Sequence, residues 1–290
     1  MPTSPHVRAL RLARELRLAR QAAGFTADTV AKKIRVSRVK VTHLETAARR
    51  PDIGDVMNIL EELDVTGDRF NELVRVARDA ATRGWWEERQ FGEMGDRQAL
   101  YANLEYGAET IQEYAPALIP GLLQTGEYMR ARNQTISDSD QSTWTFEGSV
   151  AGRLERQRVF DADNGPQLDV IAEEITVGRV TAQPRVMAQQ LQRLADAAAS
   201  HPRVRLRILP VAVDLTDSVV PHTMFQIYRY PDPGDPTVVA MEAVQKDFVW
   251  TAEPEVTPYE RLWKRLDQVA LPEDQSIELL AKAIKQLTKQ

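Results

Sequence analysis

The first eighty residues are divided into short helical segments by residues that cap or end helices. In residues 8–23 the apolar side chains recur at spacings of four, three and four, which is one face of a helix. These side chains are Leu12, Leu16, Ala19 and Ala23. Gly24 follows this segment, and Thr26 and Ser37, both preferred N-cap residues, stand eleven residues apart. The sequence therefore predicts two short helices, joined by a tight turn, next to a longer first helix.

Two further helical patterns, at residues 53–63 and 68–78, complete a unit of five helices. The chain has 290 residues, of which 43% are hydrophobic, and this is enough for two buried cores. We therefore expect an all-α domain over residues 1–82 and a second, larger domain over residues 83–290.

The helix predicted after Ser37 has an inner and an outer side. Val41 and Leu44 point inward, and a rotation of 100° per residue gathers on the opposite side a set of side chains without an acid. This set is Arg38, Val39, Thr42, His43 and Thr46. Its donors and small apolar groups match the acceptors and thymine methyl groups of the major groove. We predict that this helix binds double-stranded DNA; the alternative is a helical bundle with an incidental polar helix.

The charge of the chain is divided between its two parts. Residues 1–50 hold 12 Lys and Arg against 3 Asp and Glu, a net charge of +9. The other 240 residues hold 25 against 39, a net charge of −14, so that the total is −5. A basic segment on an acidic body indicates that only the N-terminal part meets a polyanion.

The basic segment is similar to a known family over about residues 8–80. The residues that carry the similarity are LRLARQAAGFT at 16–26, Val30-Ala31, Val36-Ser37, Val41-Thr42-His43-Leu44-Glu45 and Arg49-Arg50-Pro51. This pattern resembles the Xre family of phage-repressor-like helix-turn-helix regulators. The resemblance implies a helix-turn-helix domain in which the helix after Ser37 is the recognition helix.

The resemblance also implies roles for single residues. The family's base-reading positions fall on Arg38, Val39 and His43, and its phosphate contacts fall on Lys40, Thr42 and Arg49. Arg20 and Glu45 correspond to a buried ion pair that locks the first helix onto the recognition helix.

The sequence departs from the family at two positions. Ala27 opens the second helix, where the family usually has a glutamine that clamps a phosphate. Arg35 stands where the turn usually has glycine, so Arg35 either adds a phosphate contact of its own or is a strained turn residue.

The second part of the chain mixes helices and strands. One helix is predicted by the helical spacing of Leu100, Leu104, Ala108, Ile111 and Ala115. Further helices are expected at residues 184–199 and in two closing segments that begin at Pro258 and Pro272. Strands are expected at residues 168–172, 204–208, 223–230, 237–244 and 248–250, so that the sheet begins at residue 168. The prediction is an α+β domain with a small mixed sheet and C-terminal helices.

Two tryptophans, Trp85 and Trp86, stand at the joint between the two parts. Large aromatic side chains contribute strongly to packing, so we expect them to dock one domain on the other. The alternative is a ligand-binding aromatic box.

The second part also resembles a known domain. The motifs are Trp85-Trp86, PGLLQT at 120–125, Arg153-x-x-Arg156-Gln157, Gln190-Leu191 and Leu209-Pro210. In this order they resemble the large C-terminal domain of uncharacterised function that follows an Xre-type helix-turn-helix in many actinobacterial regulators, some called antitoxin-like. The resemblance implies a possible small cognate protein as partner.

The candidate signal or partner site takes its residues from these motifs and from a strand. The motif residues are Pro120, Gln124, Thr125, Arg153, Arg156 and Gln157. The strand contributes Arg203, Arg205 and Arg207, which alternate with apolar residues and so share one face. Such a row is either paired with acids of the same domain or forms a site for an anion or an acidic partner.

The sequence contains no constellation typical of an enzyme. The chain has no cysteine, and it lacks the zinc-protease, serine-hydrolase and phosphate-loop motifs. We therefore expect no catalytic activity, no metal and no cofactor. The absence of cysteine and of an apolar segment in Met1–His6 favours the cytoplasm, with no part in the membrane.

These observations predict a sequence-specific DNA-binding transcriptional regulator. One recognition helix covers few base pairs, so we expect a homodimer that binds two half-sites about 34 Å apart. Two alternatives remain open for the second domain. It is an antitoxin-like module that holds a small cognate protein, or it senses a ligand, possibly as an enzyme. A deep polar pocket around residues 120–125 and 153–157 would favour the ligand.

Overall fold

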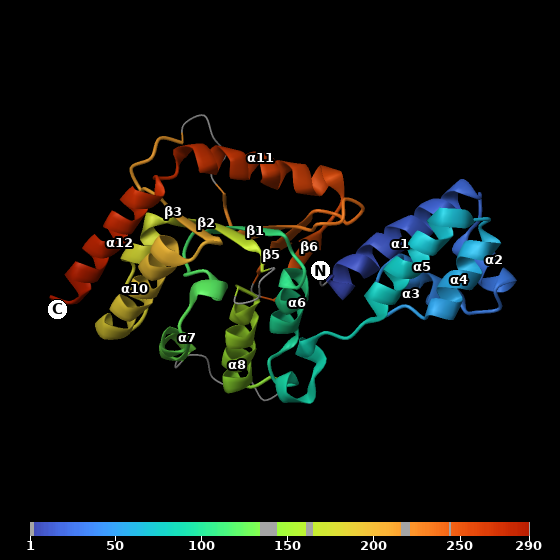
Figure 1. Cartoon of the computed structure of the whole chain (residues 1–290), viewed down its shortest axis with the longest axis horizontal. Coiled ribbons are helices and arrows are strands. Elements are labelled where there is room, and N and C mark those ends of the chain that lie inside the picture. Colours follow the sequence, from blue (N-terminus) through green and yellow to red (C-terminus); the bar gives the residue numbers. More distant parts are fainter. Residues whose placement is uncertain (1–2, 134–143, 161–164, 216–220, 244, 290) are drawn as a thin grey trace.

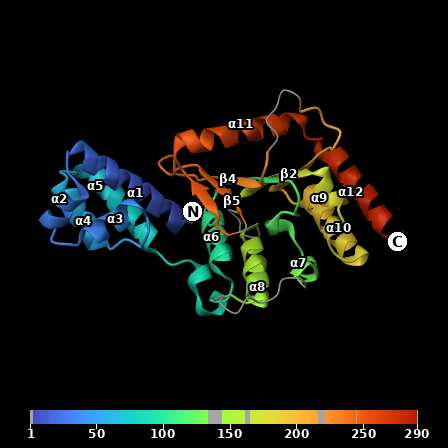
Figure 2. The same cartoon turned by 180° about the vertical axis from the view of Figure 1, so that it is seen from behind.

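Five helices form the N-terminal part of the chain, as predicted. The computed structural model describes residues 3–133, 144–160, 165–215, 221–243 and 245–289. In it the five helices stand together at one end of the molecule, away from the sheet (Figure 1 and Figure 2). They are α1 (Pro5–Ala22), α2 (Ala27–Lys33), α3 (Arg38–Glu45), α4 (Ile53–Glu62) and α5 (Gly67–Ala81).

Side-chain caps separate the short helices of this part. Thr26 Oγ1 accepts a hydrogen bond of 3.1 Å from the N–H of Thr29, and Ser37 Oγ accepts one of 3.3 Å from the N–H of Lys40. Both predicted N-caps are therefore confirmed, and each such cap stabilises its helix by about 1 kcal/mol. The apolar faces of the helices meet in one core, whose most buried members include Leu12, Leu16, Val30, Val41, Val56, Leu60 and Leu73.

A six-stranded sheet forms the centre of the second part. Its strand order is β3-β2-β1-β4-β5-β6. β1, β2 and β3 are parallel to one another, whereas β4, β5 and β6 join by antiparallel pairing, so the predicted mixed sheet is confirmed. The strands are β1 (Thr110–Ala115), β2 (Gln167–Glu173), β3 (Val204–Leu209), β4 (Phe225–Arg229), β5 (Val238–Met241) and β6 (Phe248–Trp250).

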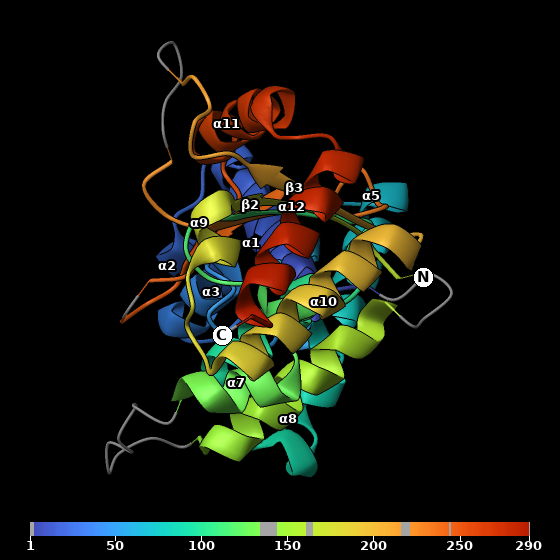
Figure 3. The same cartoon turned by 90° about the vertical axis from the view of Figure 1, so that its left-hand side faces the viewer.

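Helices cover both faces of this sheet. α11 lies over one face, and the other face carries α10 and α12, with α7 and α8 farther out (Figure 3). Among the described helices, none has the length and apolar character of a membrane span. The helices of this part are α6 (Asp96–Glu105), α7 (Gly126–Asn133), α8 (Phe146–Gln157), α9 (Glu174–Gly178), α10 (Pro184–Ser200), α11 (Glu253–Val269) and α12 (Glu273–Leu287).

The predicted single helix over residues 100–115 is wrong. α6 ends at Glu105, Gly107 has a φ of 78°, and Thr110–Ala115 is β1, a central strand of the sheet. Ile111 and Ala115 are four residues apart, and this spacing places two side chains on one face in a strand as well as in a helix. The expectation that the sheet begins at residue 168 fails for the same reason.

The two parts are held together by α1 rather than by the tryptophans. Arg8 and Arg11 extend from α1 to the turn before β5, where Arg8 Nη1 lies 3.0 Å and Arg11 Nη1 lies 3.1 Å from Asp232 Oδ2. Trp85 and Trp86 pack instead in a small cluster made of residues 85–106. The prediction that the two tryptophans dock one domain on the other is therefore wrong. The ion pairs between α1 and Asp232 could not be predicted from the sequence pattern, because the partners lie far apart in the chain.

Candidate functional site

The outer face of α3 is open to solvent. We call Arg38, Val39, Thr42, His43 and Thr46 the recognition face. All of these are exposed except His43, which is partly buried. Val39 is 59% exposed, whereas Val41 and Leu44 on the inner side are 1% and 7% exposed. The N-cap and the two inward residues thus orient the recognition face away from the core.

Acidic neighbours from α2 and α4 modify this face. Lys40 Nζ lies 2.5 Å from Asp55 Oδ2 of α4, so a phosphate contact by Lys40 requires exchange of that partner. Arg38 Nε lies 3.9 Å from Asp28 Oδ1 of α2, with both side chains well exposed. A pair this long and this exposed is weak, and it leaves the Arg38 guanidinium able to turn to a base. Neither Asp28 nor Asp55 could be predicted from the sequence pattern of α3, because both belong to other helices.

Arg20 and Glu45 form a two-pronged ion pair between α1 and the end of α3. Arg20 Nε donates to Glu45 Oε1 at 2.6 Å and Arg20 Nη2 donates to Glu45 Oε2 at 2.9 Å. Arg20 Nη1 also donates to the carbonyl oxygen of Phe25 at 2.8 Å. Both side chains are mostly buried. This planar contact fixes the angle of the recognition helix against α1.

Arg35 and Arg49 lie outside the recognition face. Arg35 is exposed with a φ of 57°, a conformation that is strained in a residue other than glycine. The structure thus shows the strained turn, and the phosphate contact by Arg35 stays a prediction. Its side chain borders a shallow hollow that Glu61 and Asp64 also line, beside α4. Arg49 is exposed in the segment that follows α3.

The motif residues of the second part come together around the 3-10 turn η3 (Gly121–Leu123). Arg153 Nη1 donates to Gln124 Oε1 at 2.7 Å, and Gln157 Nε2 donates to the carbonyl oxygen of Gln124 at 2.7 Å. Gln190 Oε1 accepts from the N–H of Thr125 at 2.7 Å. Pro120, which directly precedes η3, is buried. These contacts explain why the motifs at 120–125, 153–157 and 190 occur together.

Arg156 has a structural role within this group. It is 5% exposed, its Nε donates to Glu105 Oε2 at 2.8 Å, and its Nη1 donates to Gln98 Oε1 at 2.5 Å. The guanidinium also lies over the ring of Tyr101, 5.4 Å from the centroid. Arg156 therefore binds α8 to α6 and faces away from solvent.

Arg205 and Arg207 of the arginine row are paired with acids of the same domain. Arg207 is 3% exposed, and its Nη2 lies 2.5 Å from Asp267 Oδ1 of α11 and 3.3 Å from Asp169 Oδ1 of β2. Arg205 Nη1 lies 3.2 Å from Asp169 Oδ2. Arg203 has an interaction partner as well. For Arg205 and Arg207 the structure thus shows internal pairing, beneath α11.

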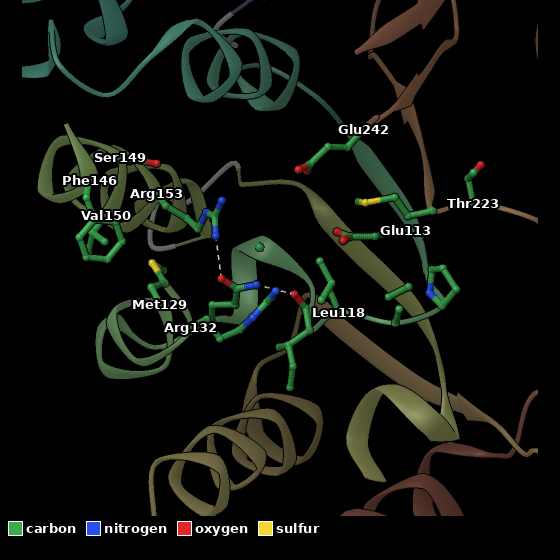
Figure 4. Close-up of a pocket in the computed structure, with 17 residues that line it drawn as sticks. Glu113, Leu118, Met129, Arg132, Phe146, Ser149, Val150, Arg153, Thr223 and Glu242 are labelled. Atoms are coloured by element: carbon green, nitrogen blue, oxygen red, sulfur yellow. Dashed lines mark hydrogen bonds between the residues drawn. The ribbon is translucent and has the colours of Figure 1, made fainter. Parts of the chain in front are cut away.

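A cavity of about 410 Å³ opens beside η3, between the strands and the helices α7 and α8. Figure 4 shows that Arg132 and Arg153 extend from the helices, while Glu113 and Glu242 lie on the side of the strands. The wall between them is largely apolar and includes Leu118, Ile119, Met129, Phe146, Val150 and Met224. A cavity therefore lies at the predicted place and includes Gly121, Gln124 and Arg153, but its wall is more apolar than the polar pocket that was expected there.

Glu113 is the most unusual group in the cavity. It belongs to β1, is 1% exposed, and its Oε2 has no hydrogen-bond partner among the described residues. Burial raises the pKa of Glu113 to about 7, although the side chain of Gln226 donates a hydrogen bond to it. Burial also lowers the pKa of Arg153 to about 10. Glu113 was not predicted as a site residue, because residues 100–115 were predicted to form a helix and Glu113 lies instead in a central strand.

Replacement of Glu113 by glutamine is expected to remove part of the pH dependence of stability. The folded chain holds the Glu113 proton up to about pH 7, whereas the unfolded chain releases it near pH 4.3, so wild-type stability falls as the pH rises between these values. The loss amounts to about 4 kcal/mol. Urea unfolding of both proteins from pH 4 to 8 measures it. Parallel curves for wild type and Glu113→Gln would contradict this interpretation.

Comparisons with known proteins agree with the two resemblances. A family described as "Helix-turn-helix domain" matches residues 11–73. A family described as "Domain of unknown function (DUF5753)" matches residues 98–282, more than half of the chain. Neither the curated proteins nor the solved structures gave a match. The matches confirm a helix-turn-helix domain followed by a domain of uncharacterised function.

Proposed function

This chain belongs to the DUF5753 family and carries a helix-turn-helix domain before that region, and from this premise we propose that it is a sequence-specific transcriptional regulator. Helix-turn-helix domains place their second helix in the major groove. Here that helix is α3, and its recognition face reads the bases. The N-terminal part supplies the affinity for DNA, and the second part supplies regulation.

The observation that carries the proposal is the exposure of the recognition face. Val39 and Arg38 stand open to solvent on a helix that Ser37 caps and that the Arg20–Glu45 ion pair holds. A methyl-bearing side chain can meet a thymine methyl group, and a guanidinium can pair with guanine. Single exposed apolar side chains are common on protein surfaces, so the support comes from the place of Val39 beside the hydrogen-bond donors of α3.

The proposed regulator binds as a homodimer. A single α3 reaches only a few base pairs, so adequate specificity requires two copies on half-sites about 34 Å apart. We place this activity in the cytoplasm, because a DNA target and a chain without cysteine both suit a reducing compartment. The second part acts by binding and not by catalysis, and a small cognate protein remains a candidate for its partner.

Two arginine variants test the assignment of roles. Arg38→Ala is expected to relax the preference for one operator sequence, by about 1 to 3 kcal/mol at the base that it contacts. Arg49→Ala is expected to weaken binding to all sequences alike and to reduce the salt dependence of affinity, because it removes a phosphate contact.

The operator for this test is first found by footprinting on genomic fragments at low ionic strength, where two protected half-sites are expected. Affinities for the operator and for scrambled DNA are then measured at several salt concentrations. If both variants remain as tight and as selective as the wild type, the proposed roles of α3 and of the segment after it are wrong.

A further inference from the structure

We propose that the cavity beside η3 binds a small amphoteric molecule, one with an ammonium and a carboxylate group on an apolar body, as in apolar amino acids and dipeptides. The carboxylate of Glu113 receives the ammonium group, and the guanidinium of Arg153 receives the carboxylate. This inference goes beyond the DNA-binding function and can be tested without DNA.

The first argument is that both charged walls carry buried polar atoms without partners. Glu113 Oε2 and Arg153 Nε are buried, and neither has a hydrogen-bond partner in the part of the chain that the structure describes. An unsatisfied buried group costs about 1 to 3 kcal/mol, and more when it is charged. Two such groups lining one cavity indicate a site whose partner is a ligand.

The second argument is the separation of charge across the cavity. Glu113 and Glu242 come from the strand side, and Arg132 and Arg153 come from α7 and α8 (Figure 4). A ligand with only a negative charge would be repelled by the carboxylates, and a ligand with only a positive charge would be repelled by the arginines. A molecule with both charges satisfies both walls at once. Since Glu242 is already paired with Arg97 at 2.9 Å, Glu113 is the acid that we assign to the ligand.

The third argument is the apolar wall and the size. Leu118, Met129 and Val150 lie between the charged sides, and the volume of about 410 Å³ is within the usual range for small-ligand pockets. A metal ion is a poorer occupant, because the described residues contain no group of three or more His, Cys, Asp or Glu side chains that could hold one.

The arrangement is also held rigid. Arg153 is fixed by Gln124, and Gln124 in turn donates through Nε2 to the carbonyl oxygen of Ile119 at 2.6 Å. Gln157 holds the backbone of the same turn. A preformed site binds with a smaller entropy cost than one that must be ordered by its ligand. Residues 120–125 and 153–157 thus hold Arg153 in place on the side of the cavity that carries the arginines.

The experiment is isothermal titration calorimetry of the full chain at pH 8, where Glu113 is ionised, with leucyl-phenylalanine and two capped forms. N-acetylation removes the ammonium group, and C-terminal amidation removes the carboxylate. We expect the free dipeptide to bind with a Kd below about 1 mM and each capped form to bind about tenfold more weakly, since a hydrogen bond to a charged group contributes about 1.5 kcal/mol or more.

Variants assign each contact to its residue. Glu113→Gln is expected to weaken binding of the free dipeptide about tenfold and to leave the affinity for the N-acetyl form unchanged. Arg153→Gln is expected to weaken binding of the free dipeptide by the same factor and to leave the affinity for the amide form unchanged. Glu278→Gln, an exposed residue of α12, is the matched control and should bind as the wild type does. Circular dichroism of each variant shows whether its fold is kept.

Three results would overturn the proposal. The first is that no form binds up to about 10 mM, which would mean that the cavity holds only water. The second is that all three forms bind with equal affinity. The third is that the Glu113 and Arg153 variants fold and bind the free dipeptide as tightly as the wild type does. None of these results bears on DNA binding by α3, so failure here is distinguishable from failure of the proposed function.

Discussion

Substitution of Val39 by glutamate is expected to abolish operator binding while leaving the fold unchanged. Val39 is 59% exposed in the middle of the recognition face, so the folded state tolerates a charged side chain there. In the complex the new carboxylate would replace an apolar contact and lie between two rows of phosphates. We expect a loss of at least about 100-fold, measured by fluorescence anisotropy with operator DNA at fixed salt.

The matched control for this variant is Val180→Glu. Val180 is 50% exposed and precedes α10 in the second part, so the substitution adds the same charge far from α3 in the sequence. This variant should bind DNA as the wild type does. An equal loss in both variants would point to a general charge effect, and full binding by Val39→Glu would show that the recognition face does not enter the groove.

Removal of Arg156 is expected to cause a large loss of stability. Arg156→Met leaves Glu105, which is 2% exposed, as an unpaired buried carboxylate in α6. Breaking a buried ion pair from one side costs about 3 to 5 kcal/mol. Urea unfolding followed by tryptophan fluorescence measures this loss, because Trp86 packs on Tyr106 close to the same helix.

A double variant distinguishes the unpaired charge from the lost packing. In Arg156→Met with Glu105→Met no charge remains buried at this place, so most of the lost stability should return. If the double variant is as unstable as the single one, the arginine acts through shape and not through charge.

The pH gives a second check on the single variant. Burial raises the pKa of Glu105, while Arg156 opposes this shift. Without Arg156 the pKa of Glu105 rises further, so the folded variant keeps a proton that the folded wild type releases. The deficit relative to wild type should therefore grow as the pH rises through the folded wild-type pKa of Glu105, which is itself raised. A deficit that does not change with pH would contradict this account.

Local patterns predicted the N-terminal part well. The spacing of Leu12 and Leu16, the caps at Thr26 and Ser37, and the inward Val41 all appear in the structure as expected. Each of these features depends on residues within about one helical turn of one another, where the backbone geometry decides which side chains share a face. The confirmed helix-turn-helix domain is a product of such short-range rules.

Patterns in the second part were less decisive. Ile111 and Ala115 fit a helix and a strand equally well, and only the pairing of β1 with β2 and β4 shows that they form a strand. Alternation correctly placed Arg205 and Arg207 on one side of β3. It did not show that α11, with Asp267, covers that side and buries Arg207.

The sequence by itself determined the helices at the N-terminus, the outward face of α3 and the segregation of charge, because these follow from local periodicity and composition. Only the tertiary structure decided that Glu113 of β1 faces Arg153 of α8 across one cavity. These residues are forty positions apart and belong to different layers. No local rule couples them, because their meeting depends on which strands pair and on which face of the sheet the helices pack.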